Sequence, residues 1–315
     1  MPEMESTTPL DLQQIPGGDG AGEFVEEEIS KLDVPFTVIN ITTTVAAVVL
    51  PFFFHSTSAI VAFVVFYTIT GLGLTAGYHR LFAHRSYEVP KWLEYLICVC
   101  GYLAIQRGPL FWVAMHRLHH KHSDVPGKDP HTPKEGLWHV HFGWTQKRRK
   151  DVWNQTLYRR LVPDLARDRF YVWLDDERKD YATYFLLLAV SFIVGGFLAT
   201  EAGFDLNNAV CFFIWVGLLN RVALLHAFGL INSVCHLFGT RPYQTAGHDE
   251  SVNNGLVALL IFGEGWHNNH HAFPASARHG LRWYQIDPAW YAIWLLKKMG
   301  LAKKVRLPKK RKGTE

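Results

Sequence analysis

Histidine is the residue type that could do the most chemistry in this chain, since 17 of the 315 residues are histidines and many stand in close clusters. In "HRLHH" and "HNNHH" the imidazoles lie three and four residues apart, so each trio shares a helix face and can converge on one or two metal ions. "HRLFAH" and "NSVCH" add further imidazoles. The candidate ligands are His79, His84, His116, His119, His120, His236, His267, His270 and His271.

The number of donors indicates the kind of metal site. Nine nitrogen donors exceed what one tetrahedral zinc ion takes, which predicts two ions with positions left open for water or substrate. Imidazole suits iron, zinc, copper and nickel alike, so ligand type does not choose the metal. His79 and His84 are about 140° apart on an ideal α-helix. Either the helix ends between them or they serve different metals.

Other polar residues are expected around this site. Nearby carboxylates would orient the ring N–H groups of the ligands, and the candidates are Glu88, Asp124, Asp129 and Glu264. We expect packed or capping roles for His55, His226, His248 and His279. Positions on the substrate side, beside the ligands or at the surface are expected for His122, His131, His139 and His141.

The elements that must position these residues are apolar helices. With 49% hydrophobic and 14% aromatic residues, the chain has the composition of a membrane protein. Crossing a bilayer takes about 20 apolar residues, and four stretches come near that length: Phe36–Phe54, Ala59–Tyr78, Tyr184–Thr200 and Ala209–Leu230. The shorter run Trp92–Ile105 is typical of an interfacial or re-entrant helix. Arg221 and His226 interrupt the fourth stretch. An ionisable residue within a span indicates function. For Arg221 the alternative is that its side chain snorkels or pairs near the end of the span.

Basic residues predict the orientation. They crowd the connection between the second and third stretches and the C-terminal end, so these segments, both termini and the histidine clusters should face the cytoplasm. We therefore expect an all-α integral membrane protein with four transmembrane helices, an interfacial helix and a cytoplasmic helical cap that carries a histidine-rich di-metal site. Residues 1–33 should form a disordered acidic tail, 34–300 the membrane domain and 301–315 a basic tail. The net charge of +4 requires no nucleic acid partner.

Three histidine boxes occur in the order "HRLFAH", "HRLHH" and "HNNHH", with "TAGYHR", "HFGW" and "GEGWHNNHHAFP" around them. This pattern resembles the membrane fatty acyl desaturases of the delta-9, stearoyl-CoA desaturase-like type. The resemblance covers roughly residues 36 to 300. It implies a non-haem di-iron enzyme that uses O2 and two external electrons to introduce a cis double bond, with delta-9 expected, into a saturated acyl chain carried on CoA or on a lipid. It also implies the nine histidines as iron ligands, with Asn232 acting through a bound water. All-nitrogen sites accept zinc in place of iron as well.

Substrate contacts and partners are expected beyond the metal site. Tyr67 and Gly71 should lie near the methyl end of the acyl chain, with ordinary helix packing as the alternative. Ala114 and Met115 stand where animal acyl-CoA desaturases carry an Arg-Asp pair, so that branch's CoA contacts are not implied. Further candidate substrate residues are Trp144, in "HFGW", and Arg117, Lys121 and Arg148, which with Arg149 and Lys150 could bind phosphates of CoA or lipid, or anionic head groups.

The electron supply and two rival functions complete the expectations. No haem-binding or iron–sulfur cysteine pattern occurs, so a ferredoxin or a cytochrome b5-like donor is expected, and a basic cytoplasmic face suits an acidic partner. The protein would lie in a bacterial inner membrane or in the endoplasmic reticulum. A di-iron acyl-chain hydroxylase uses similar histidine boxes. A histidine-rich metal transporter would instead place its imidazoles at mid-membrane along a path, whereas these clusters lie outside the spans.

Overall fold

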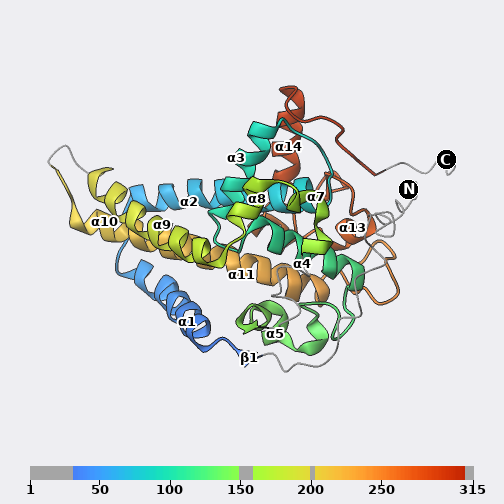
Figure 1. Cartoon of the computed structure of the whole chain (residues 1–315), viewed down its shortest axis with the longest axis horizontal. Coiled ribbons are helices and arrows are strands. Elements are labelled where there is room, and N and C mark those ends of the chain that lie inside the picture. The colour runs from blue at the N-terminus through green and yellow to red at the C-terminus, as the bar shows by residue number, and fades with distance from the viewer. Residues whose placement is uncertain (1–30, 149–158, 199–202, 309–315) are drawn as a thin grey trace.

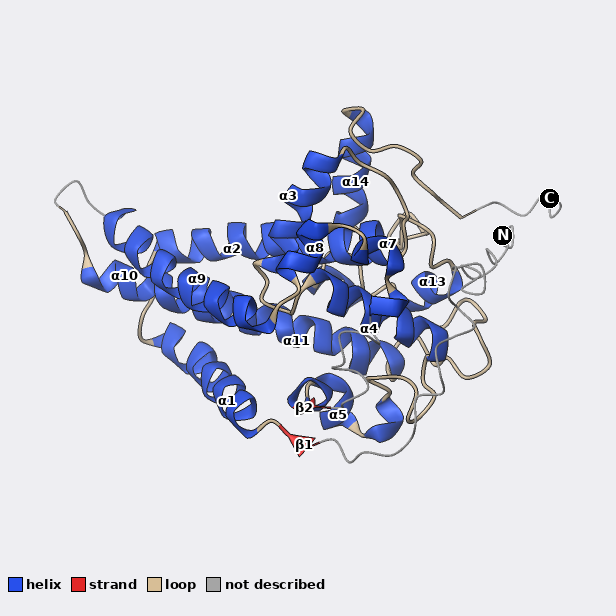
Figure 2. Ribbon diagram, viewed as in Figure 1, coloured by secondary structure: helices blue, strands red, loops and turns tan. Residues whose placement is uncertain are grey.

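A computed structural model describes residues 31–148, 159–198 and 203–308. The described chain is helical (Figures 1 and 2) except for one antiparallel pair of two-residue strands, β1 (Lys31–Leu32) and β2 (Lys147–Arg148). The all-α expectation is therefore confirmed in its coarse form.

Three helical rods form the body of the molecule, and each is long and apolar enough to cross a membrane. The α2 rod (Thr57–Ala83) consists of α2 (Thr57–Leu72) and the π-helix η4 (Gly73–Ala83). The second rod is α9 (Glu177–Leu198). The α11 rod (Leu206–His236) is continuous through α10 (Leu206–Phe212), η7 (Phe213–Leu219), α11 (Asn220–Ser233) and η8 (Val234–His236). Figure 1 shows these rods running along the long axis of the molecule.

The first predicted span is shorter than the other three. It forms α1 (Val34–Val49) followed by the 3-10 turn η3 (Leu50–Phe52), with an apolar helical stretch, Phe36–Phe52, of fewer than 18 residues. Asp33 begins α1 by accepting a hydrogen bond from the backbone N–H of Phe36 at 3.2 Å. Ser56 begins α2 in the same way with the N–H of Ala59, at 3.2 Å.

Two rods extend further at their C-terminal ends than hydropathy predicts, and α9 begins seven residues before the predicted Tyr184. The second predicted span ends at Tyr78 and the fourth at Leu230, whereas the helices continue to Ala83 and His236. The extra turns carry polar side chains that are buried in protein instead of facing lipid, so the helix continues after the hydropathy has fallen. His79 and His236 consequently lie on the rods and not after them.

The remaining helices form a cap on one end of the rods. Its order is α3 (Lys91–Tyr102), α4 (Pro109–His122), η5 (Pro133–Glu135), α5 (Leu137–His141), η6 (Gly143–Gln146), α7 (Pro163–Ala166), α8 (Arg169–Leu174), α12 (Gly255–Leu260), α13 (His267–Ala272) and α14 (Pro288–Lys298). The predicted interfacial run corresponds to α3, which ends three residues before Ile105. In Figure 1, α3 and α14 project steeply away from α2.

The π-helix η4, at the end of the α2 rod, is enclosed by the cap, and all of its residues are buried. It packs on α3 through a contact between Gly73 and Gly101 that leaves no room for a Cβ atom on either. Its Arg80 is fully buried and joins the C-terminal part of the chain: Nη2 lies 3.0 Å from a Glu264 oxygen and 2.9 Å from an Asp287 oxygen. These contacts fix the end of the α2 rod against the segments that carry the third histidine box.

The predicted tails are described only in part. Residues 1–30 and 309–315 lie outside the described residues; residues 31–32 form β1, and Asp33 caps α1. Residue Lys303 pairs with Glu88 through two backbone hydrogen bonds of 2.8 and 2.9 Å, and the Arg306 N–H donates to the Ser86 carbonyl. The first part of the predicted basic tail is therefore attached to the cap.

Candidate metal centre

All nine histidines selected from the sequence lie together in the structure, in two groups. In each group, one ring nitrogen of every member lies within 4.8 Å of those of the others. The five-histidine group contains His79, His84, His116, His120 and His270, and the four-histidine group contains His119, His236, His267 and His271. The sequence left open whether each box serves one ion or two, and the structure divides both trios between the groups.

Helical geometry explains this division. On α4, His116 and His120 are four residues apart and point the same way, whereas His119 turns toward the other group. On α13, His270 joins the five-histidine group while His267 and His271 join the other. Sequence neighbours thus serve different groups, and the groups adjoin: the rings of His120 and His271 stack with centroids 4.5 Å apart.

The spacing of His79 and His84 is resolved by the π-helix. The His84 N–H donates to the His79 carbonyl at 3.1 Å, which is the i→i+5 pattern of a π-helix. The wider turn places residues five apart one above the other, and the two ring centroids are 4.9 Å apart. The helix η4 ends at Ala83, between the two histidines, as the first of the two alternatives stated. Both rings lie in the same group, which does not favour the second alternative, that they serve different metals.

Carboxylates stand behind four of the rings. His79 Nδ1 lies 2.6 Å from Glu264, His119 Nδ1 lies 3.0 Å from Asp129, and His236 Nδ1 lies 2.9 Å from Asp124. The fourth pair is His271 Nδ1 with Asp249, at 3.3 Å. The prediction that Glu88 would also orient a ligand ring is wrong. Glu88 lies at the surface and pairs with Lys304, because its chain segment runs beside residues 303–304.

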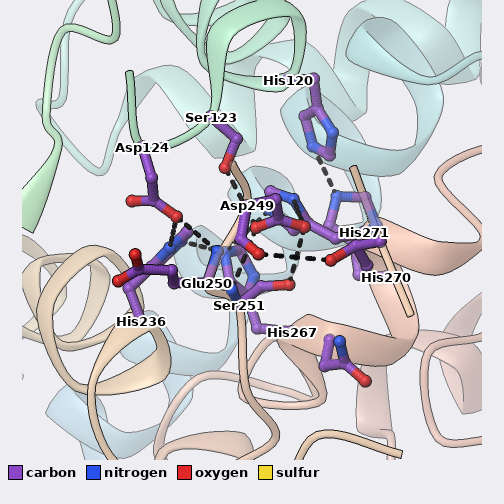
Figure 3. A network of polar contacts seen from close by, with 12 residues as sticks. His120, Ser123, Asp124, His236, Asp249, Glu250, Ser251, His267, His270 and His271 are labelled. Atoms are coloured by element: carbon purple, nitrogen blue, oxygen red, sulfur yellow. Dashed lines mark hydrogen bonds and ion pairs between the residues drawn. The ribbon is translucent and has the colours of Figure 1, made fainter. Parts of the chain in front are cut away.

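Asp249 is the partner that the sequence did not reveal. It lies in a loop, where no helical period links it to a histidine box. Figure 3 shows it held beside His271, with Ser123 Oγ donating to one oxygen at 3.1 Å and Ser251 Oγ to the other at 3.0 Å. Burial alone would raise the pKa of Asp249, but the adjacent His271 and the Ser251 N–H keep that pKa below its usual value.

The ring nitrogens on the inner side have the character that metal ions require. An ionised carboxylate only accepts hydrogen bonds, so Nδ1 of His119 and of His271 carries a proton, and in the neutral ring Nε2 keeps a lone pair. These two Nε2 atoms face each other at 3.4 Å, and those of His236 and His267 at 3.0 Å. Facing lone pairs repel unless a cation lies between them. The residues present therefore fit metal ions bound by neutral imidazoles.

The protonation states of five ligand histidines agree with this fit, whereas burial lowers the pKa of His119 but the adjacent Asp129 raises it above the usual value. Burial lowers the pKa values of five histidines well below the usual value, and neighbouring imidazoles lower them further. They are His84, His116, His120, His267 and His270. Neutral histidine is the form that binds a metal ion.

A cavity of about 200 Å³ reaches one of the two groups. His79, His116 and Glu264 line it, together with Trp112 and the predicted water-holding residue Asn232. Members of the four-histidine group are absent from the described lining. The predicted substrate residue Trp144 also lines the cavity, which continues from the histidines toward side chains of α1, α9 and α11.

The other predicted substrate residues lie elsewhere. The Tyr67 hydroxyl donates to the Leu260 carbonyl at 2.9 Å, and a Cβ atom on Gly71 would overlap the ring of Phe262, so the packing alternative fits this pair better. Arg117 is engaged internally, with the Phe82, Ala83 and Leu161 carbonyls and with Asp164. Lys121 is exposed, and the side chain of Arg148 lies outside the described residues, as do Arg149 and Lys150.

Histidines outside the two groups are also placed. His279 lies against the five-histidine group, 3.3 Å from Glu264, although only packing was expected of it. His131 lies beside His119 and Asp129, which is the position beside the ligands that was one of the alternatives predicted for it. His141 and His226 share a contact of 3.1 Å.

The fold and the centre define a helical protein with apolar rods and two adjacent histidine groups that could hold metal ions. Residues 56–302 match the fatty acid desaturase family. The sn-2 palmitoyl-lipid 9-desaturase of Nostoc sp. (strain 36) is 41% identical over 261 residues, covering 82% of this chain and 85% of the relative. Delta-9 acyl-lipid desaturase 2 of Arabidopsis thaliana is 41% identical over 278 residues, covering 88% and 82%. Icosanoyl-CoA 5-desaturase of Limnanthes douglasii is 38% identical over 278 residues, covering 88% and 73%.

The chain belongs to the fatty acid desaturase family, and it is a fatty acyl desaturase, an oxidoreductase. The resemblance stated from the histidine boxes to the delta-9 type is thereby confirmed. The hydroxylase and transporter alternatives are not favoured.

Proposed function

We propose that this desaturase introduces a cis double bond at the delta-9 position of a saturated acyl chain, using O2, two iron ions and two electrons from an external donor. The observation that carries the proposal is the pair of histidine groups with facing Nε2 atoms at the end of a cavity. Delta-9 names of relatives from Nostoc and Arabidopsis support the position of the double bond.

In this proposal each histidine group holds one iron ion, and Asn232 contributes through a bound water. The iron pair, when bound, supplies the O2-dependent oxidising chemistry that an unactivated acyl chain requires. The carboxylates behind His79, His119, His236 and His271 fix the ring tautomer and make the ligands more basic. Because all-nitrogen sites also accept zinc, a preparation can carry zinc instead.

The cavity walls hold the substrate chain. Trp112, which stacks on His116, lines the cavity together with Phe111 and Phe228, and these rings keep water away from the reacting carbons. Removal of two hydrogens releases two electrons and two protons. Two further electrons from the donor and two further protons complete the reduction of one O2 to two waters.

The proposed membrane position follows from the rods. The three long rods cross the bilayer and α1 crosses as a fourth, shorter span, with the cap and both termini in the cytoplasm. The helices α3 and α14, steeply inclined to α2 in Figure 1, expose Trp92 and Trp294 at 60% and 47%, as helices lying at the interface do. A bacterial inner membrane or the endoplasmic reticulum both suit this arrangement.

The proposed electron donor is a ferredoxin or a cytochrome b5-like protein. Lys121, near the end of α4, and Lys128, in the loop that follows, are both exposed. The same loop carries Asp124 and Asp129. A basic surface so close to the four-histidine group suits an acidic donor.

Expression in cells with a known fatty acid profile tests the function. Total fatty acids of cells that express the wild type, His120→Ala or His122→Ala would be analysed by gas chromatography and mass spectrometry, with double bonds located by derivatisation. His122 is a matched control, because it ends the same helix and lies outside both groups. We expect a new delta-9 monounsaturated acid with the wild type and with His122→Ala but not with His120→Ala. Hydroxylated chains, or a bond at another position, would contradict the proposal.

A further inference from the structure

Arg221 is a buried cation without an acidic partner. It lies midway along the α11 rod and is only 8% exposed. Its Nη2 donates to the side-chain oxygen of Asn40 at 2.5 Å, whereas Nε and Nη1 have no hydrogen-bond partner. Among the described residues, no carboxylate lies within ion-pair distance of it. A guanidinium in such surroundings is costly, so neither snorkelling nor internal pairing explains this residue.

Other unused hydrogen-bond donors gather at the same place. Arg221 lines the cavity, and so do Gln106 and Tyr184, whose Nε2 and hydroxyl groups are buried without a partner. The Tyr184 ring also lies 5.1 Å from the guanidinium. Asp180 lines this end as well, but its charge is offset by Arg107 at 3.7 Å. This donor end of the cavity (Gln106, Tyr184 and Arg221) is therefore suited to a ligand group rich in acceptor oxygens.

The donor end lies at a defined distance from the histidines. Eleven residues separate Arg221 from Asn232, which is about 16 Å along an α-helix. Tyr184 stands two turns inside α9, whose first turn carries Glu177 and Asp180. The donor end therefore lies about 10 Å inside the polar start of α9, between the apolar part of that rod and the cap.

The cavity also has walls that face the membrane side. Ile39 of α1 and Phe185 of α9 line it, and these apolar side chains are 40% and 62% exposed. A ligand that enters between these two helices comes from the lipid phase, with its polar group held at the boundary. The large hydrophilic carrier of an acyl-CoA would instead have to approach from the aqueous face.

We propose that Arg221, with Gln106 and Tyr184, binds the ester and phosphate oxygens of a membrane glycerolipid whose acyl chain enters between α1 and α9. This inference rests on the proposed function and identifies the carrier as a membrane lipid. The planar guanidinium binds phosphate and carbonyl oxygens with two parallel N–H groups, so it both anchors the polar group and sets how far the chain reaches toward the histidines. Arg117, the sequence candidate for carrier phosphates, is already engaged by backbone carbonyls and Asp164.

A binding measurement tests this without requiring turnover. The purified full-length, metal-loaded protein in detergent micelles would be titrated with a phosphatidylglycerol that carries a mid-chain dibrominated stearoyl group, and separately with the same acyl group on CoA. Bromine quenches the fluorescence of nearby tryptophans, and Trp112 and Trp144 line the cavity. Arg178→Gln is the matched control, because Arg178 is an exposed cation at the start of α9.

The expected result is a tenfold or larger loss of affinity for the lipid probe in Arg221→Gln, as the loss of a charge-assisted hydrogen bond implies. Arg221→Lys should lose less, and Arg178→Gln should bind as the wild type does. Unchanged lipid binding in Arg221→Gln, or an equal loss for the CoA probe, would overturn the assignment. If Arg221→Gln does not fold, Gln106→Leu combined with Tyr184→Phe tests the same end. A protein that binds the lipid but yields no unsaturated product would refute the proposed function and leave this inference standing.

Discussion

The two histidine groups differ in what surrounds them. Five rings of one group share a single adjacent carboxylate, Glu264, whereas three carboxylates stand behind the four rings of the other, namely Asp124, Asp129 and Asp249. The described cavity touches the five-histidine group alone. Three of the four carboxylates thus lie on the side away from the cavity, and only Glu264 lines it.

This asymmetry indicates different roles for the two proposed ions. A carboxylate behind an imidazole makes the imidazole a better ligand and holds its orientation, so the four-histidine group should retain its ion more firmly. The five-histidine group has more rings, but fewer of them are held by a carboxylate. It also borders the space that a substrate chain can enter. We expect the ion there to be the one exposed to O2 and substrate.

Removing one ligand from each group should have the largest effect. His119→Ala deletes one of only four rings, so we expect one of two ions to be lost and desaturation to fall below detection. His84→Ala leaves four rings in its group, so we expect most of the metal to remain while desaturation is lost. Metal content per chain, measured by mass spectrometry beside product formation, checks this. Equal metal loss in both variants would contradict the proposed difference.

Removing one carboxylate should have a smaller effect. Asp249→Asn keeps shape and size but leaves His271 Nδ1 without its anionic partner. Loss of such a partner lowers metal affinity about 10- to 100-fold, which a competing chelator titration would measure. Glu250→Gln is the control, since Glu250 is the exposed neighbour whose side chain pairs with Lys134. An affinity in Asp249→Asn equal to that of the control would remove the proposed role.

The comparison also separates what the sequence could reveal from what it could not. The histidine spacings on α4 and α13 are local and follow helical periodicity, so the clusters were predictable from the residues alone. The division of each box between two groups was not predictable, because it depends on how α4, α13 and η8 meet in space. Asp249 carries no periodic signal, and the shared site of His79 and His84 requires a π-helix that hydropathy does not detect. The sequence revealed Arg221 as a charged residue within an apolar stretch. That it lacks an acidic partner depends on how the rods pack and could not be predicted.

Two substitutions along the rods distinguish packing from substrate contact. A leucine at Gly71 would overlap Phe262, so Gly71→Leu should destabilise the fold by about 1–3 kcal/mol without shortening the preferred acyl chain. Leu225→Trp fills part of the cavity and should shorten the preferred chain. Product profiles with acyl chains of different lengths, and thermal unfolding in detergent, check both. A shorter preferred chain in Gly71→Leu would restore the substrate role first expected of Tyr67 and Gly71.

The smallest expected effect concerns the cap and not the metal groups. Asp164 lies 2.8 Å from Arg117 and 2.7 Å from Arg85, and although burial raises its pKa, these two guanidinium groups lower it below the ordinary 3.8. Because the folded pKa is depressed, the interaction stabilises the fold fully above about pH 5 and is lost as the pH falls through 3.8 toward the folded value. The carboxylate is partly exposed, so Asp164→Asn should cost about 1 kcal/mol at neutral pH. Thermal unfolding midpoints of wild type and variant should differ by about 2 °C at neutral pH and converge in acid, and a difference that persists in acid would mean that packing, rather than charge, makes this residue stabilising.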